Sequence, residues 1–251
     1  MEIITSSENK LIKELTSLQS KKQRHKIGKF LLESKRSIEE ALIYGTEPEM
    51  VVLRENVELP AFLSDYKGMV VVVEERLFPK LSTTENSQGI IGVYKFFDTK
   101  INNFLAKEKL LFLDGIQDPG NLGTIVRSAA AFGLDGILIG PGSVDIYNDK
   151  VLRSTLGGIF ALPILDIKTE ELKLFKKHGF SIVGAALGGK NIYNYAFSLK
   201  TVVGVGNENS GLSQDFIDLA DDFITIEINN KMESLNASVA ASIVLYELNR
   251  I

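Results

Sequence analysis

Residues 110–127 read LLFLDGIQDPGNLGTIVR, and this stretch decides the class of fold. The apolar run at its start predicts a buried strand, and Asp-Pro-Gly in its middle is a turn signal. Apolar residues then recur at helical spacing, at Leu122, Ile125 and Val126. Asn121 is placed as the N-cap of that helix. The stretch therefore predicts a strand, a glycine-bearing loop and a helix, in that order.

The same alternation continues downstream. Short apolar runs predict further strands at 136–139, 181–183, 201–205 and 223–226, and a helical pattern at 235–249 closes the chain. Continuous apolar strands separated by helices indicate an α/β fold with a parallel sheet covered on both faces. In such a sheet ligands bind in the loops at the carboxyl ends of the strands, which is where the glycines of this half lie.

Upstream of the stretch, residues 1–98 predict a smaller α/β domain. Its expected elements are helices at 10–20, 36–44 and 59–66 and strands at 30–32, 50–53, 69–73 and 90–93. Residues 99–108 are polar and lack a strong apolar period, so we expect a linker there. The larger domain then occupies residues 109–251.

Composition excludes several classes of protein. The 251 residues are 45% hydrophobic and 24% charged, as in ordinary globular proteins, and the absence of Cys excludes disulfides, thiol catalysis and zinc–thiolate sites. Two histidines, His25 and His178, are too few for a His-rich metal centre, so we expect no metal. The chain has neither an apolar run of roughly 18–20 residues nor a signal-peptide pattern at its start. We therefore expect a cytoplasmic protein that does not contact the membrane.

Charge is distributed unevenly. The whole chain carries −4, yet residues 10–36 hold nine basic and two acidic residues, a net charge of +7. A one-signed cluster of this kind is typical of contacts with RNA phosphates, although a solvated helix face is the common alternative. The residues predicted to contact RNA are Lys10, Lys21, Lys22, Arg24, Lys26 and Arg36.

Two glycine patterns imitate nucleotide-binding motifs. Residues 184–190, GAALGGK, have the spacing of a phosphate loop, but Asn191 replaces the hydroxyl residue that would hold Mg²⁺ and no helix is predicted to follow. The glycines at 204, 206 and 211 are too widely spaced for a dinucleotide fingerprint. A nucleotide hydrolase is therefore disfavoured.

Two further segments carry polar residues beside glycine or a helix start. Residues 204–213, GVGNENSGLS, form a glycine-rich turn straight after a strand, with one carboxylate, Glu208, inside it. In residues 226–240, IEINNKMESLNASVA, Ser234 is the expected N-cap of the last helix and Asn236 falls in its first turn. Taken singly, each segment also fits simple turn or cap formation.

Together and in this order, the three segments resemble the SpoU/TrmH branch of the SPOUT RNA methyltransferases. The resemblance rests on residues 118–123 with Arg127, on 206–213 and on 234–240, and residues 147–157 look like a stretch that members carry between motifs. The N-terminal part is similar to the family's substrate-binding extension. The chain departs from the family where members usually have Pro-Met and a nearby Gly, since it has Glu227, Ile228 and Asn230. In the second motif Asn207 and Asn209 replace commoner residues.

The resemblance implies a deep trefoil knot in the larger domain, binding of S-adenosylmethionine and a homodimer formed through the larger domains. It also implies methyl transfer to a ribose 2′-hydroxyl of RNA, and the long basic extension favours ribosomal over transfer RNA. The alternative, motivated by the departures, is a non-catalytic RNA-binding or ribosome-assembly protein that keeps the fold.

The resemblance also assigns roles. Arg127 corresponds to the residue that acts on the hydroxyl, and because a guanidinium group keeps its proton we expect Arg127 to orient phosphate and stabilise developing negative charge. The other catalytic candidates are Asn121, Glu208, Ser234 and Asn236. The candidates for binding the cofactor are Val205, Gly206, Asn207, Gly211, Ile226, Ile228, Leu235 and Ala237.

Overall fold

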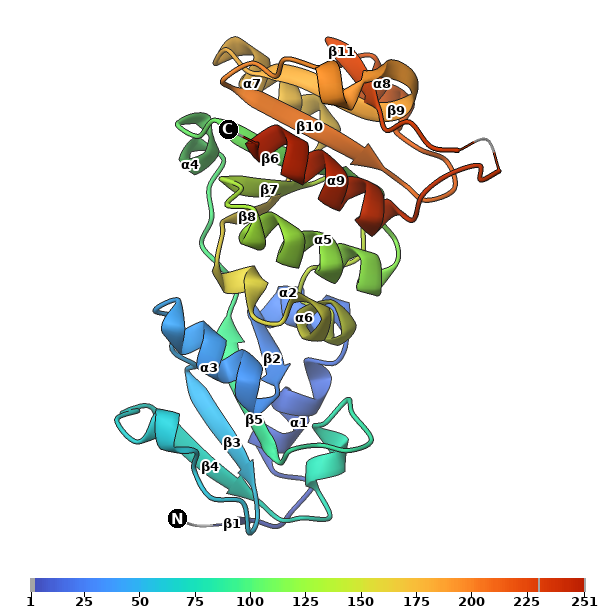
Figure 1. Cartoon of the computed structure of the whole chain (residues 1–251). Coiled ribbons are helices and arrows are strands. Elements are labelled where there is room, and N and C mark those ends of the chain that lie inside the picture. The colour runs from blue at the N-terminus through green and yellow to red at the C-terminus, as the bar shows by residue number, and fades with distance from the viewer. Residues whose placement is uncertain (1–2, 230, 251) are drawn as a thin grey trace. The chain divides into compact units, whose positions relative to one another are not determined.

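The computed structural model in Figure 1 describes residues 3–229 and 231–250. Its described residues fall into two compact units. The first is drawn from Met1–Asp98 and Asp145–Phe160, and the second from Thr99–Val144 and Ala161–Ile251. Residues 145–160, which were expected in the larger domain, therefore pack with the first unit.

The first unit contains a five-stranded mixed sheet in the order β1-β4-β3-β5-β2. β1, β4 and β3 run parallel, whereas β5 is antiparallel to both β3 and β2. The strands are β1 (Ile3–Ile4), β2 (Lys29–Glu33), β3 (Met50–Arg54), β4 (Met69–Val73) and β5 (Ile90–Lys95). The four strands expected here are confirmed, because each contains a short apolar run of residue types that favour strands.

Helices of the first unit are short. They are α1 (Lys10–Ser17), α2 (Lys21–Ile27), α3 (Lys35–Ile43) and α6 (Asp149–Thr155), with 3₁₀ turns η1 (Ala61–Leu63), η2 (Phe78–Lys80) and η3 (Gly158–Phe160). The helix expected at 59–66 is wrong, since only the turn η1 forms there. Leu63 is the one buried residue of that turn, so the segment has no apolar stripe with which a longer helix would pack.

A hydrophobic core lies between α1 and the first sheet, where Ile12, Leu15 and Leu18 contact Val52 and Ile91 among others. A second cluster is aromatic and includes residues of the 145–160 segment. Its rings are those of Phe30, Tyr94, Phe96, Phe97, Tyr147 and Phe160.

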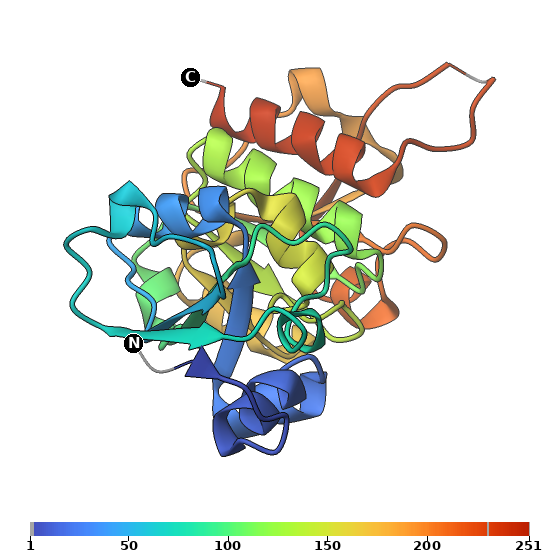
Figure 2. The same ribbon diagram turned by 90° about the horizontal axis from the view of Figure 1, so that it is seen from below.

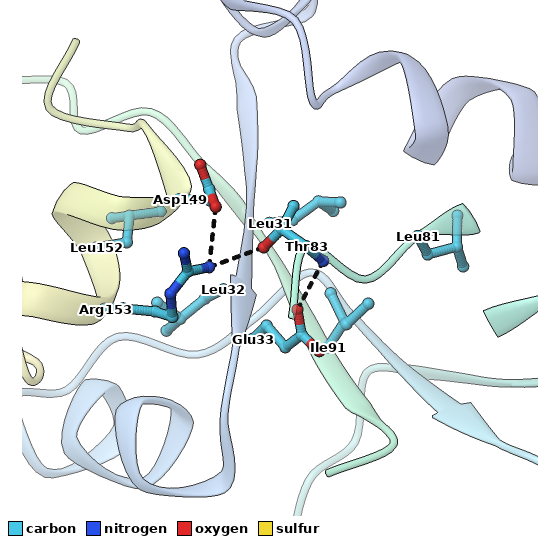
Figure 3. Close-up of a pocket in the computed structure, with 9 residues that line it drawn as sticks. All are labelled: Leu31, Leu32, Glu33, Leu81, Thr83, Ile91, Asp149, Leu152 and Arg153. Atoms are coloured by element: carbon cyan, nitrogen blue, oxygen red, sulfur yellow. Dashed lines mark hydrogen bonds and ion pairs between the residues drawn. The ribbon is translucent and has the colours of Figure 1, made fainter. Parts of the chain in front are cut away.

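Figure 3 shows polar contacts that attach α6 to the first unit. Arg153 Nη1 donates to Thr83 Oγ1 at 2.8 Å and pairs with Asp149 at 2.9 Å, one helical turn away. The Thr83 backbone N–H in turn donates to Glu33 Oε2 at 3.0 Å. Apolar residues line the small cavity around these contacts, so the polar network lies beside packed apolar side chains.

The second unit contains a six-stranded sheet in the order β11-β9-β10-β6-β7-β8, with every neighbouring pair parallel. The strands are β6 (Lys109–Asp114), β7 (Gly136–Ile139), β8 (Ile164–Asp166), β9 (Ser181–Asn191), β10 (Thr201–Gly206) and β11 (Asp222–Thr225). The predicted parallel sheet and its five expected strands are confirmed. β8 was not expected, because three residues after Pro163 are too few to show a pattern.

The helices of the second unit are α4 (Asn102–Leu105), α5 (Pro119–Ala131), α7 (Leu172–Lys177), α8 (Gln214–Ile217) and α9 (Ala237–Asn249), with turns η4 (Thr169–Glu171) and η5 (Ile192–Asn194). In Figures 1 and 2 α5 and α9 lie side by side. Residues 99–108 are not plain linker, since α4 forms within them. Phe104 of α4 is fully buried in the core of this unit, and this contact accounts for the helix.

No helix within the described residues has the length and apolar character needed to cross a membrane.

Candidate active site

The three motifs lie in loops that follow the carboxyl ends of β6, β10 and β11. β6 and β10 are adjacent and parallel, and Gly206 at the end of β10 is in register with Asp114 at the end of β6. Because parallel strands end at the same edge of a sheet, the first two loops start side by side.

The first loop enters α5 through Asp118. This residue is the N-cap, and its Oδ1 accepts a hydrogen bond from the Asn121 backbone N–H at 2.8 Å. The prediction that Asn121 is the N-cap is therefore wrong. Pro119 explains the difference, because proline is favoured at the first helical position and places the cap on the residue before it. The Asn121 side chain is left available for contacts with other loops.

The second loop is closed on itself and tied to the first. Asn207 and Gly211 exchange two backbone hydrogen bonds, of 2.9 and 3.0 Å. A Cβ atom on Gly206 would lie 2.2 Å from the carbonyl carbon of Gly211, so this close approach requires glycine. The Asn207 side chain donates to the Gly115 carbonyl at 2.7 Å, which joins this loop to the first motif.

Asp114 makes a second tie between the same loops. Its side chain is buried at the end of β6, and its Oδ2 accepts from the Ser213 backbone N–H at 2.6 Å. Ser213 is also the N-cap of α8. Sequence reasoning missed both Asp114 and Asp118. The signal available for Asp118 was its position directly before Pro119. No residue near Asp114 in the sequence indicates that it would contact Ser213.

The third loop leads into α9 through Asn236. Its Oδ1 accepts from the backbone N–H groups of Ser238 at 2.9 Å and Val239 at 3.3 Å. Asn236 is therefore the N-cap, and the prediction that Ser234 fills that position is wrong. Ser234 lies two residues earlier and is exposed. Asn236 lies directly before the helix, and its side chain is longer than that of serine. It therefore reaches two backbone N–H groups in the first turn of α9.

A chain of side-chain hydrogen bonds joins the three motifs. Asn236 Nδ2 donates to Asn121 Oδ1 at 3.0 Å, and Asn121 Nδ2 donates to Glu208 Oε1 at 2.8 Å. These bonds connect residues that are 115 and 87 positions apart in the sequence. The amides of Asn121 and Asn236 each use their nitrogen as a donor and their oxygen as an acceptor, so their neighbours determine which way each amide faces. Three of the predicted catalytic residues are thus brought together.

Arg127 lies on α5, the helix that starts at the first loop, and its side chain is exposed. It makes no hydrogen bond or ion pair with any residue that the structure describes. Gly123, one turn earlier, is buried and adds no side chain beside it. The guanidinium group is therefore available to an anionic or hydroxyl-bearing ligand.

The residues predicted to bind a cofactor differ in exposure. Ile226, Ile228 and Leu235 are half-buried in the third loop, whereas Val205 and Ala237 are buried in β10 and α9. Because the side chains of Val205 and Ala237 are buried, only the backbone groups of these two residues could contact a cofactor. Asn230 lies outside the described residues.

Five of the six predicted RNA-contacting residues are exposed, namely Lys10, Lys21, Lys22, Lys26 and Arg36. Arg24 is the exception and corrects the prediction. Its guanidinium is buried, with Nε 3.0 Å from Asp145 Oδ2, and it also donates to the carbonyls of Leu18 and Gln19. The carboxylate and the end of α1 satisfy this cation internally, so it is removed from the surface that contacts solvent.

The segment that imitates a phosphate loop forms part of β9, and η5 rather than a full helix follows it. Lys190 pairs with Asp222, and this hydrogen bond is the main cause that lowers the pKa of Asp222. Burial, with a further contribution from Asp222, raises the pKa of Tyr195 to about 12. Lys190 is thus engaged, and the segment has neither the helix nor the free lysine of a phosphate loop. No group of three or more metal-ligating side chains occurs among the described residues.

Comparisons with known proteins agree with this geometry. The model of the "SpoU rRNA Methylase family" matches residues 108–246, and that of the "MRM3-like substrate binding domain" matches residues 9–92. The 23S rRNA (guanosine(2553)-2′-O)-methyltransferase RlmP of Bacillus subtilis is 32% identical over 253 aligned residues, which cover 99% of each chain.

Solved structures are similar over the same length. An AdoMet-bound rRNA methyltransferase from Sinorhizobium meliloti superposes with a TM-score of 0.87 at 28% identity, covering 98% of this chain and 97% of the other. An RNA 2′-O ribose methyltransferase superposes with a TM-score of 0.80 at 30% identity, covering 98% of each chain. The fold is therefore that of SPOUT methyltransferases, with a small α/β unit before the parallel-sheet unit. Since the family model covers more than half of the chain, this protein belongs to the SpoU rRNA methylase family.

Proposed function

We propose that this protein transfers a methyl group from S-adenosylmethionine to a ribose 2′-hydroxyl of ribosomal RNA. The observation that carries the proposal is the hydrogen-bonded chain Asn236–Asn121–Glu208, which joins all three motifs at one edge of the sheet. The name of the Bacillus relative makes the ribose of a guanosine in 23S ribosomal RNA the first target to test.

The residues at this edge fit the cofactor. At Gly206 the second loop lies so close to its own Gly211 that no side chain fits there, and half-buried Ile226, Ile228 and Leu235 supply partly exposed apolar surface. Backbone groups of these four residues would hold adenine and ribose. S-adenosylmethionine supplies an electrophilic methyl group on its sulfonium. The chain itself must align the ribose oxygen with that methyl group and assist loss of the hydroxyl proton.

Arg127 has the chemistry for the charge that develops on the ribose oxygen. A guanidinium group remains protonated in proteins, so Arg127 donates hydrogen bonds rather than accepting the proton. It would contact the adjacent phosphate and stabilise negative charge as the O–H bond weakens. Asn121, Asn236 and Glu208 hold one another in fixed orientations, and we assign them to positioning the ribose. Ser234, exposed in the third loop, stays a candidate for the same role.

The first unit supports RNA as the substrate. It matches the substrate-binding family model and presents five exposed basic side chains between Lys10 and Arg36. Salt-sensitive contacts between such cations and phosphates supply much of the affinity of proteins for RNA.

We further propose a homodimer formed through the second unit, a trefoil knot in that unit and action in the cytoplasm, where ribosomal RNA is found. Support for the dimer comes from exposed aromatic surface at α5 and α9. Phe132 is 37% and Tyr246 54% exposed, and their rings lie 5.8 Å apart in an edge-to-face contact. Apolar surface of this kind is stabilised when a second copy covers it.

The experiment that tests the function compares Arg127→Ala with wild type. Arg127→Ala is expected to abolish 2′-O-methylation of ribosomal RNA while calorimetric binding of S-adenosylmethionine persists. Arg76→Ala, which removes an exposed arginine of the first unit whose ion-pair partner Glu74 is only half-buried, is the matched control and should retain activity. Full turnover by Arg127→Ala would refute the assigned role. No heat of binding at millimolar S-adenosylmethionine would instead favour a non-catalytic RNA-binding protein.

A further inference from the structure

Helix α2 presents cations that no described residue of the first unit neutralises. Lys21, Lys22 and Lys26 are exposed, and none of them forms an ion pair with a residue that the structure describes. Lys29, just after the helix, differs because it pairs with Glu49 at 2.9 Å. The charge of α2 is thus left for an external partner.

His25 lies among these lysines and is held in a fixed orientation. Its Nε2 lies 3.3 Å from Asp145 Oδ1, and its ring meets the ring of Phe96 edge to face at 5.1 Å and 82°. Phe96 is itself stacked on Tyr147, with ring centroids 3.9 Å apart. In spite of these contacts, 42% of the His25 side-chain surface remains exposed. The result is an aromatic ring that contacts two residues of the first unit and that solvent can still reach.

The carboxylate that orients His25 does not repel anions at the surface. The Asp145 side chain is 4% exposed, and its charge is paired with the buried guanidinium of Arg24. His25 also lies four residues after Lys21 and three after Lys22, so the three side chains share one face of α2. A ring and two free cations are therefore presented together.

We propose that this face of α2 binds one unstacked nucleotide of the RNA substrate. The base stacks on the His25 imidazole, and the flanking phosphates contact Lys21 and Lys22. This proposal rests on the proposed function, because it takes RNA as the ligand. Single-stranded RNA is recognised by stacking its bases on aromatic or histidine rings within a positively charged surface.

The chemistry favours a loop or bulge over a double helix. In duplex RNA the bases are stacked on one another, and no ring face is available to a protein side chain. The site offers a single exposed ring with cations on the same helix face, which suits one base with its adjoining phosphates. Binding at α2 would thus favour RNA whose structure exposes an unstacked base with its flanking phosphates.

The test uses three substitutions of one residue in the full-length protein. His25→Ala removes the ring, His25→Gln keeps a donor for Asp145 without a ring, and His25→Tyr keeps an aromatic face. We expect His25→Ala and His25→Gln each to raise the Kd and KM for a ribosomal RNA fragment by about tenfold, with kcat at saturating RNA unchanged. His25→Tyr should restore most of the affinity. His178→Ala, the same substitution at the exposed histidine that ends α7, is the matched control.

The outcomes distinguish the nucleotide site at His25 from the proposed methyltransferase function. Wild-type affinity of His25→Ala, or of His25→Gln, overturns stacking at this position. If wild-type protein binds the RNA with the expected dependence on His25 but methylates nothing, the nucleotide site stands and the proposed function falls. If wild-type protein methylates the RNA and His25→Ala does so with unchanged KM, the function stands and the site falls. If wild-type protein binds no RNA, both are overturned.

Discussion

Replacing Arg24 with Met should destabilise the first unit severely. The Arg24 side chain is 6% and the Asp145 side chain 4% exposed, so the substitution leaves a carboxylate buried without its cation. Breaking a buried ion pair by removing one partner typically costs about 3–5 kcal/mol. The carbonyls of Leu18 and Gln19 also lose their donor, and each such hydrogen bond contributes about 0.5–1.5 kcal/mol. Domains of this size are stable by only about 5–15 kcal/mol, so the loss is a large fraction of the total.

The assay must report on each unit separately, because a chain of two compact units need not unfold in one step. Hydrogen exchange resolved by mass spectrometry meets this need. Arg24→Met should accelerate exchange in peptides from α2 and from residues 145–160 much more than in peptides from β6 and β10. A double variant, Arg24→Met with Asp145→Leu, removes both charges and should recover part of the loss.

A loss below about 1 kcal/mol in Arg24→Met would show that Arg24 does not stabilise a buried charge on Asp145, because a buried carboxylate that loses its cation costs more than this. Equal acceleration in both units would also contradict it, because the pair lies wholly within the first unit. If the double variant is no more stable than Arg24→Met, removing the unpaired charge gains no more than is lost with the hydrogen bond from the Tyr147 backbone N–H and the contact with His25.

Three further predictions concern single residues. Gly206→Ala should weaken calorimetric binding of S-adenosylmethionine by about tenfold or more, because the added Cβ meets backbone at 2.2 Å and the second loop must open; unchanged affinity would contradict this. Burial alone would raise the pKa of Glu33, but hydrogen bonds from the loop at 82–87 outweigh it and hold that pKa below its usual 4.5. The stabilisation by Glu33 is therefore complete above pH 4.5 and is lost as the pH falls through the lower folded pKa, so Tm should fall with acid less steeply in Glu33→Gln than in wild type. Asn236→Asp keeps an N-cap acceptor but loses the amide donor to Asn121, so Tm should change little while methylation falls; equal activity would argue against the hydrogen-bonded chain.

Secondary structure was predictable wherever the pattern was local. The strands β3, β4 and β6 each contain a short apolar run that predicts a strand, although the structure leaves β4 only partly buried. Predictions failed where the pattern was short or overridden by a neighbour. β8 has three residues, and Pro119 moved the cap of α5 from Asn121 to Asp118.

The roles of some functional residues were likewise predictable from adjacent positions, whereas others depend on distant residues. The glycine requirement at Gly206 was visible in sequence as a glycine-rich turn, since turn geometry depends on adjacent residues. The exposure of Arg127 and the burial of Arg24 were not distinguishable, because both are arginines within helical stretches. Their surroundings differ only through residues far along the chain, such as Asp145 for Arg24.

Sequence alone therefore identified the parallel-sheet architecture, the three loops and the family resemblance, because apolar period, turn residues and motif order are properties of neighbouring positions. The bonds from Asn236 to Asn121 and from Asn121 to Glu208 emerge only in the folded chain. So does the inclusion of residues 145–160 in the first unit. A hydrogen bond needs donor and acceptor about 3 Å apart, and for residues some hundred positions apart only the packing of the whole sheet and its helices brings them that close.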